Sequence, residues 1–397
     1  MNNKELMAVS VNNNILYINF EIFRNLFESS HIYYKKEYQD ALRNKRIRLK
    51  ILQRLAREAN IPYALFFAPK KLVEKQIERY QKELFKGVDN GLFSISGRGN
   101  IDIRDVSLVI KDILQRQKIL RKGFPNEEDN KIRGMLKGST DDISIQARKL
   151  TKIIGFDLET FRGFSGKEKA YNYLVDLFES NNVLVSRSRP GAMPQSINKK
   201  VSFSGLAVRD KKFPTIFLCA NDETMIGDPT GRRIFTLFLL LVCIAKDKFL
   251  PVSYNSRSRE IISVDEYRIV EEILMPEMEF TGIEVSDIEL VNQFASLCKI
   301  TPRATLARLR RLGGVSESDY NIFYEYLDQK YIKDKKNSNH PFAVSVYTKI
   351  KTYCGLEFTR RVFLMYDAGA LSKGEMRRLL LFNKKPSGFL EALRNHL

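Results

Sequence analysis

The segment 232–245 reads Arg-Arg-Ile-Phe-Thr-Leu-Phe-Leu-Leu-Leu-Val-Cys-Ile-Ala, and its character decides how the rest of the chain is arranged. A Gly-Asp-Pro-Thr-Gly turn precedes it at 227–231, and charged residues follow it at 246–248. Its apolar run is roughly 12 residues long, whereas a helix needs about 20 to cross a bilayer. A short helix that is apolar on every side is buried in a protein core. The segment therefore predicts the central helix of a folded domain.

The composition indicates a globular protein with a polyanionic partner. The chain has 397 residues, of which 44% are hydrophobic and 28% are charged. This length allows two or three domains with cores of their own. A net charge of +19 and a pI near 9.6 favour nucleic acid as the partner, with an anionic membrane surface as the second choice. The plain alternative is that the charge serves solubility alone.

The N-terminus and the cysteines favour a cytoplasmic protein. Residues 1–5 are polar, so they do not resemble a secretion signal, and no later segment is long and apolar enough to span a membrane. The four cysteines are far apart and form no Cys-x-x-Cys pair. Reduced, buried thiols are therefore expected rather than disulfides or a metal site. The four are Cys219, Cys243, Cys298 and Cys354.

A series of motifs surrounds the central helix in a definite order. The amphipathic helix 167–180 is followed by the strand 183–185, by strand-like segments at 201–208 and 214–221, by the central helix, and then by Leu-Met-Pro at 274–276. This order resembles the ImmA/IrrE-type metallopeptidase family, in which an Arg-x-Phe-Thr entry leads directly into His-Glu-x-x-His. The resemblance runs from residue 60 to residue 360. It implies a zincin-like core with a small mixed sheet.

The catalytic residues of that family are missing here. In His-Glu-x-x-His, two imidazoles four residues apart bind one zinc ion, and the adjacent glutamate polarises the water on the metal. The resemblance places Leu239, Leu240 and Cys243 at these positions and Ser263 at the third ligand. Leucine can neither coordinate a metal nor accept a proton. We therefore expect a pseudoprotease without metal or cofactor, whose former cleft has become core.

A basic segment near the N-terminus is the first candidate DNA contact. A strand is expected at 15–20 and a continuous basic helix at 33–57. The segment 49–67 resembles the end of the Cro/repressor-type helix-turn-helix module that often precedes this peptidase domain. A solvated basic helix face is the alternative interpretation. The residues that we expect to contact DNA are Arg43, Arg46, Arg48 and Lys50.

A second candidate lies past the central helix, in a pair of helices at 286–312. Thr301 has the character of an N-cap and Pro302 that of a first helical residue. A cationic second helix after a short turn is typical of a helix-turn-helix that enters the major groove. A packing unit with a solvated face is the alternative. The arginines expected to point outward are Arg303, Arg308, Arg310 and Arg311.

The sequence thus predicts a mainly helical α+β protein. Its three parts would be an N-terminal helical module at 1–125, a pseudopeptidase core at 126–280 and a C-terminal helical module at 281–397. We expect a cytoplasmic regulator that binds DNA, protein or both and that serves a mobile element, toxin–antitoxin pair or phage-defence system. Its expected partners are DNA, a repressor-like or toxin/antitoxin protein, and a second copy of the chain in a homodimer. An active hydrolase or metalloprotease with a rearranged site, and a protein scaffold that does not bind DNA, stay open as alternatives.

Overall fold

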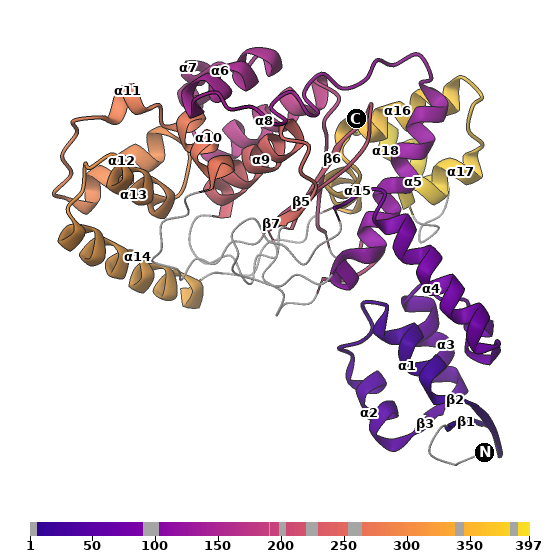
Figure 1. Cartoon of the computed structure of the whole chain (residues 1–397). Helices are drawn as coiled ribbons and strands as arrows, with labels where there is room; N and C mark the ends of the chain where they lie inside the picture. The colour runs from indigo at the N-terminus through magenta and orange to yellow at the C-terminus, as the bar shows by residue number, and fades with distance from the viewer. Residues whose placement is uncertain are drawn as a thin grey trace. The chain divides into compact units, whose positions relative to one another are not determined.

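The computed structural model is an α+β protein, mainly helical, with two small mixed sheets (Figure 1). It describes residues 6–89, 103–189, 191–197, 204–219, 229–252, 264–337, 345–381 and 388–397. The chain divides into two compact units. Unit 1 contains residues 1–92, 102–114 and 194–198, and unit 2 contains 93–101, 115–193 and 199–397. The three-part division expected from the sequence stays a prediction.

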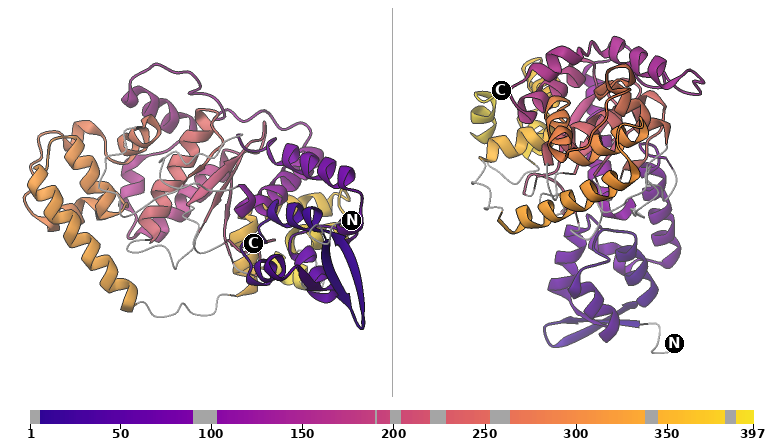
Figure 2. Two further views of the ribbon diagram at one scale, coloured as in Figure 1. Left: turned by 60° about the horizontal axis from the view of Figure 1, so that its bottom comes forward. Right: turned by 90° about the vertical axis from the view of Figure 1, so that its left-hand side faces the viewer.

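Unit 1 is built on a three-stranded sheet in the order β2-β1-β3. Strands β1 (Leu6–Val11) and β2 (Asn14–Asn19) form an antiparallel hairpin, and β3 (Arg46–Arg48) pairs with β1 in parallel. Figure 2 shows the hairpin at the edge of its unit. The helices of this unit are α1 (Phe20–Glu28), α2 (Lys36–Asn44), α3 (Leu49–Glu58), the 3-10 helix η2 (Tyr63–Phe67), α4 (Lys70–Leu84), η3 (Ile103–Val106) and the first half of α5 (Ser107–Gly123).

The predicted strand at 15–20 is confirmed, but the continuous helix expected at 33–57 is wrong. Lys45 takes a left-handed backbone conformation with φ of 47°, which ends α2. The next three residues then extend as β3, and Ile47 is buried while its two neighbours are exposed. Alternation of buried and exposed residues is the pattern of a strand, so Arg-Ile-Arg contained the signal for this break.

Aromatic side chains form the core of unit 1. Phe23 and Phe27 of α1, Tyr38 of α2 and Phe66 of η2 are all buried, and their rings contact one another at centroid distances of 4.8–6.2 Å. Such pairs add stability beyond the area that they bury, by about 0.5–1.5 kcal/mol each. This core fixes α1, α2 and η2 against the inner face of the sheet.

Unit 2 contains a four-stranded sheet in the order β4-β6-β5-β7. Its helices and strands follow the sequence expectation closely around the centre of the chain. They are α6 (Ile143–Ile154), α7 (Leu158–Gly163), α8 (Lys167–Ser180), β4 (Leu184–Arg187), β5 (Gly205–Val208), β6 (Thr215–Leu218), α9 (Pro229–Ala245), β7 (Pro251–Val252), α10 (Asp265–Leu274), α11 (Glu277–Phe280), α12 (Ile288–Leu297), α13 (Pro302–Arg311), α14 (Glu317–Asn337), α15 (Val346–Cys354), α16 (Leu356–Asp367), α17 (Lys373–Leu381) and α18 (Gly388–Arg394).

Helices cover both faces of this sheet. Ile216 of β6 belongs to the hydrophobic core that α8 and α9 share, whereas the next residue, Phe217, contacts the ring of Tyr353 in α15. Successive residues of a strand point to opposite faces, so these two contacts place α15 on the face opposite α8 and α9. A sheet covered on both faces needs apolar residues throughout, which explains why every residue of β5 and β6 is buried.

Helix α9 is the centre of unit 2, as the sequence predicts. Residues 237–245 are all buried, and the helix packs against α8, α10, β5 and β6. No helix among the described residues is long and apolar enough to cross a membrane. Residues 229–231 of the expected turn instead form the start of α9, and residues 227–228 lie outside the described residues.

Candidate nucleic-acid interface

The positions that the resemblance assigns to the two zinc-binding histidines and the catalytic glutamate are packed as core. Leu239, Leu240 and Cys243 are each at most 1% exposed. Burial is the main cause that raises the pKa of the Cys243 thiol far above its ordinary value, so no thiolate forms there. A Cβ atom on Gly205 of β5 would lie 2.9 Å from Leu240 Cδ1, which shows how closely sheet and helix approach. Ser263 lies outside the described residues.

The described residues contain no group of three or more His, Cys, Asp or Glu side chains that could hold a metal ion. At the centre of α9, two of the three positions carry leucines, which offer no donor atom, and the third carries a neutral, buried thiol. This arrangement stabilises the fold through apolar burial and supplies neither a nucleophile nor a base.

The expectation that the arginines of α13 point outward is wrong for Arg303 and Arg308. Arg308 is 3% exposed; its Nη2 donates to Glu272 Oε2 at 2.6 Å and its Nε to the Met275 carbonyl at 3.2 Å. Arg303 is 6% exposed, forms an ion pair with Asp328 of α14 and stacks on the Tyr324 ring at 4.7 Å. Both guanidinium groups therefore bind residues in the interior of unit 2.

The two remaining arginines of α13 are partly exposed but also paired. Arg310 lies 2.7 Å from Glu317 and 4.2 Å above the Tyr320 ring, and Arg311 Nε lies 3.1 Å from Glu271. The helix has the caps expected from the sequence, since Thr301 Oγ1 accepts a hydrogen bond from the Ala304 amide. The predicted helix pair is thus present, but its cations balance carboxylates of unit 2.

The basic segment of unit 1 keeps its charge at the surface. Arg43, Arg46, Arg48 and Lys50 are all exposed. Arg43 pairs with Asp40, whereas the other three make no ion pair with any residue that the structure describes. The segment 43–57 contains seven Lys or Arg residues and no Asp or Glu. Arg54 of this segment pairs with Glu37, but no described carboxylate balances the positive charge of Arg46, Arg48 and Lys50.

The start of α3 adds to this positive field. Arg48 occupies its N-cap position without capping the helix through its side chain, and the first turn contains no acidic residue. The amide groups of a helix N-terminus carry a partial positive charge. Arg46, Arg48 and Lys50 thus lie next to a further source of attraction for phosphate groups. We call Arg46, Arg48, Lys50 and the start of α3 the basic corner.

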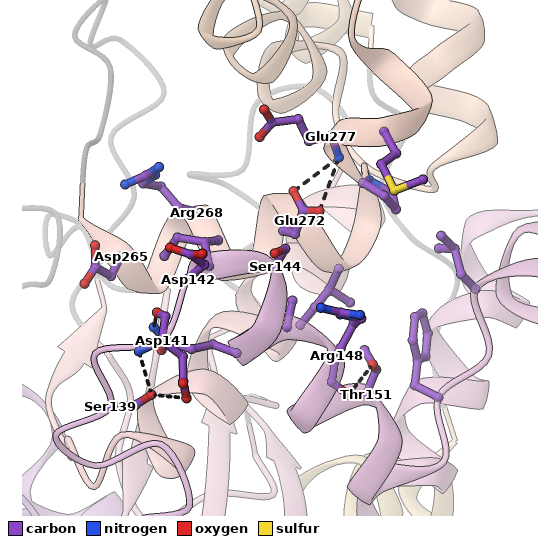
Figure 3. A pocket seen from close by; sticks show the side chains of 18 of the residues that line it. Ser139, Asp141, Asp142, Ser144, Arg148, Thr151, Asp265, Arg268, Glu272 and Glu277 are labelled. Atoms are coloured by element: carbon purple, nitrogen blue, oxygen red, sulfur yellow. Dashed lines mark hydrogen bonds between the residues drawn. The ribbon is translucent and has the colours of Figure 1, made fainter.

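A polar cavity of about 890 Å³ lies in unit 2 between α6 and α10–α11 (Figure 3). Figure 3 shows Asp142, Asp265 and Arg268 at one end and Arg148 with Thr151 at the other. The carboxylate of Glu272 in its wall accepts from the Glu277 amide and pairs with Arg308. The residues that line the cavity supply hydroxyl groups from the α6 side and carboxylates from both sides, and they include no histidine or cysteine. The cavity therefore lacks a nucleophile with an adjacent imidazole base.

Comparisons with family models, with curated proteins and with solved structures found no match to this chain.

Proposed function

We propose that this protein is a DNA-binding regulator that contacts nucleic acid through the basic corner of unit 1. The observation that carries the proposal is the contrast between two arginine-rich segments. Those of α13 are paired with acids of their own unit, whereas Arg46, Arg48 and Lys50 are exposed without such partners. Exposed cations that face no carboxylate attract phosphates and release counterions when they bind them.

For unit 2 we propose a zincin-like pseudopeptidase core of the ImmA/IrrE type. Support comes from the order α8, β4, β5, β6, α9, which is the order of helix and strands that the resemblance implies. Leu239 and Cys243 lie on α9 where the family has its zinc-binding histidines, Leu240 lies where it has the catalytic glutamate, and all three are buried. Such a core binds or positions a partner and performs no hydrolysis. By the same resemblance the regulated system belongs to a mobile element, a toxin–antitoxin pair or phage defence.

The test is DNA binding across a salt series. A mixed-sequence duplex and one of its separated strands are titrated with the wild type, with Arg46→Ala/Arg48→Ala and with Lys71→Ala/Lys75→Ala. The last variant is a matched control, because Lys71 and Lys75 are exposed on α4 of the same unit and their removal changes the charge equally.

We expect the logarithm of the binding constant to fall linearly with the logarithm of the salt concentration. Loss of two phosphate contacts should reduce that slope by about 1.8 for the duplex or about 1.4 for the single strand. The control should keep the wild-type slope. Absence of binding to either DNA at low salt would refute the proposal. Equal losses in the two variants would show that only net charge matters and would refute the assignment to the basic corner.

Zinc content tests the pseudopeptidase core. We expect purified protein to contain much less than one zinc ion per chain by elemental analysis. One tightly held zinc ion per chain would contradict a core without a catalytic metal and would favour a rearranged metalloprotease.

A further inference from the structure

The outer face of the unit 1 sheet combines aromatic, small and cationic side chains in two rows. The register pairs Ala8 of β1 with Tyr17 of β2 and with Arg46 of β3. It also pairs Ser10 with Ile15 on one side and with Arg48 on the other. Paired residues on neighbouring strands project to the same side of a sheet. One face therefore carries Tyr17-Ala8-Arg46 in one row and Ile15-Ser10-Arg48 in the next.

Burial separates this face from the core. Met7, Val9, Ile18 and Ile47 alternate with the residues of the two rows, and all four are buried. On the outer face, by contrast, Arg46 and Arg48 are exposed and Tyr17 is 61% exposed. The three strands contain no acidic residue. The outer face is thus a surface whose only formal charges are two guanidinium groups.

The dimensions of this face suit a nucleotide chain. Neighbouring strands lie about 4.8 Å apart, so the Cα atoms of Tyr17 and Arg46, two strands apart, are separated by roughly 10 Å. Between them Ala8 and Ser10 form a low floor that allows close approach. The exposed ring of Tyr17 can stack on a base. The guanidinium groups of Arg46 and Arg48, on the other side of Ala8 and Ser10, can bind the phosphates of the nucleic-acid backbone. Both elements are those that sheet surfaces use to bind unpaired bases.

We propose that this outer face binds single-stranded nucleic acid, with a base stacked on Tyr17 and the sugar–phosphate backbone held by Arg46 and Arg48. The inference rests on the proposed DNA-binding function and names its substrate class. A duplex keeps the faces of its bases stacked on one another, so it can use the two arginines but not the tyrosine ring. Discrimination between the two forms of DNA is therefore expected to depend on Tyr17.

The absence of tryptophan from the sequence provides a direct test. Tyr17→Trp introduces a single tryptophan reporter on the outer face of the unit 1 sheet. Tyr63→Trp is the matched control, because Tyr63 is 52% exposed but lies on η2, outside the sheet. Each full-length variant is titrated with a thymidine oligonucleotide of about 12 nucleotides, a length within the range that single-strand sites cover, and with a mixed-sequence duplex. Tyr17→Ala, Tyr17→Phe and Tyr63→Ala are compared by fluorescence anisotropy of labelled DNA.

We expect the oligonucleotide to quench the tryptophan emission of the Tyr17→Trp variant and to leave that of the Tyr63→Trp variant unchanged. Tyr17→Ala should weaken single-strand binding by about 5- to 150-fold, the range for loss of one stacked base. Tyr17→Phe should bind as the wild type does, and Tyr63→Ala should have no effect. Circular dichroism establishes whether each variant is folded. If Tyr17→Ala is not, the quenching expected for Tyr17→Trp but not for Tyr63→Trp still tests the inference.

Failure of this inference differs from failure of the proposed function. Suppose that both DNA forms bind, that Arg46→Ala/Arg48→Ala weakens both, and that Tyr17→Ala weakens neither. This result would refute stacking of a base on Tyr17 and would support DNA binding through the basic corner. If neither form binds, both proposals fall. Tryptophan emission of the Tyr17→Trp variant that changes with protein concentration in the absence of DNA would assign the face to a second copy of this chain and would also overturn the inference.

Discussion

Replacing Arg308 by alanine should destabilise unit 2 far more than the same replacement of its neighbour Arg310. The Arg308 guanidinium is enclosed by α10 and α13, where it pairs with Glu272 and donates to the Met275 carbonyl. Glu271, with an oxygen 4.0 Å from Arg308, is buried as well. Burial already raises the pKa of Glu271, and Arg311 and Arg308 oppose that rise. Without Arg308, the poorly hydrated carboxylate of Glu272 loses its arginine partner, and Glu271 loses the weaker of its two arginine neighbours.

The expected magnitude follows from this enclosure. Removing one partner of a buried ion pair costs about 3–5 kcal/mol, because the remaining charge stays buried without compensation. In a unit of this size each kcal/mol shifts the melting temperature by about 2–4 °C, so a fall of roughly 6–20 °C is expected. Arg310 pairs with Glu317, whose side chain is 66% exposed. Its ion pair and its stacking on Tyr320 together contribute about 2 kcal/mol or less.

Thermal unfolding followed by circular dichroism measures both variants, with the transition of unit 2 analysed separately from that of unit 1. Arg308→Ala/Glu272→Ala completes the comparison. Because the second substitution removes the stranded carboxylate, the double variant should lose much less than the sum of the two single losses. Equal melting temperatures for Arg308→Ala and Arg310→Ala would refute the claim that the α13 arginines serve the interior of unit 2.

Three further predictions concern pH, thiols and one glycine. Burial raises the pKa of Glu179 from 4.5 to about 7, although hydrogen bonds from the Glu357 and Val185 amides lower it. Because the fold favours the neutral form, the free energy of unfolding should decrease by about 3 kcal/mol as pH rises from 4.5 to 7. Denaturation curves at several pH values measure this dependence, and Glu179→Gln should remove it. All four cysteines are buried thiols that form no disulfide. A thiol reagent should therefore label none of them in the native protein and all four in urea, and rapid native labelling would contradict this packing. Gly355 has φ of +85°, and a Cβ atom there would lie 2.6 Å from the Val185 carbonyl oxygen. Gly355→Ala should therefore lower the free energy of unfolding by about 1–3 kcal/mol or more. Gly163→Ala, whose Cβ would have no atom within 4 Å, should lower it little.

The central part of the fold was predictable because its signals are local. An unbroken apolar run can only be a buried segment, and α9 and β6 lie where such runs occur. The strands that the prediction missed or merged into a helix are β1, β3 and the two-residue strand β7. The three residues of β3 are too few to outweigh the helical pattern on either side, and Lys45 carries the left-handed turn without a glycine to announce it.

The error over α13 has a different origin. Its inward-facing leucines, Leu306 and Leu309, were predictable from helical spacing and are buried. The sequence offers no sign that Arg308 also turns inward, because its partner Glu272 lies 36 residues earlier on another helix. Long side chains reach partners that helical periodicity does not identify. The two rows of the unit 1 sheet were hidden for the same reason, since the strand register brings Tyr17 and Arg46 together from distant positions.

The hydrogen bonds of Glu179 affect the order in which unit 2 can fold during synthesis. Its carboxylate accepts from the Val185 amide at 3.3 Å and from the Glu357 amide at 3.0 Å, 178 positions later in the chain. Beside it, Ser186 of β4 donates to the carbonyl of Tyr353. Until α15 and the start of α16 leave the ribosome, one face of β4 has no cover and a buried acid lacks one of its donors. A nascent chain therefore exposes an incomplete apolar sheet from the synthesis of β4 until that of α16, which is less than half of its translation. Most residues of unit 1, apart from the short segment at 194–198, have been released before then.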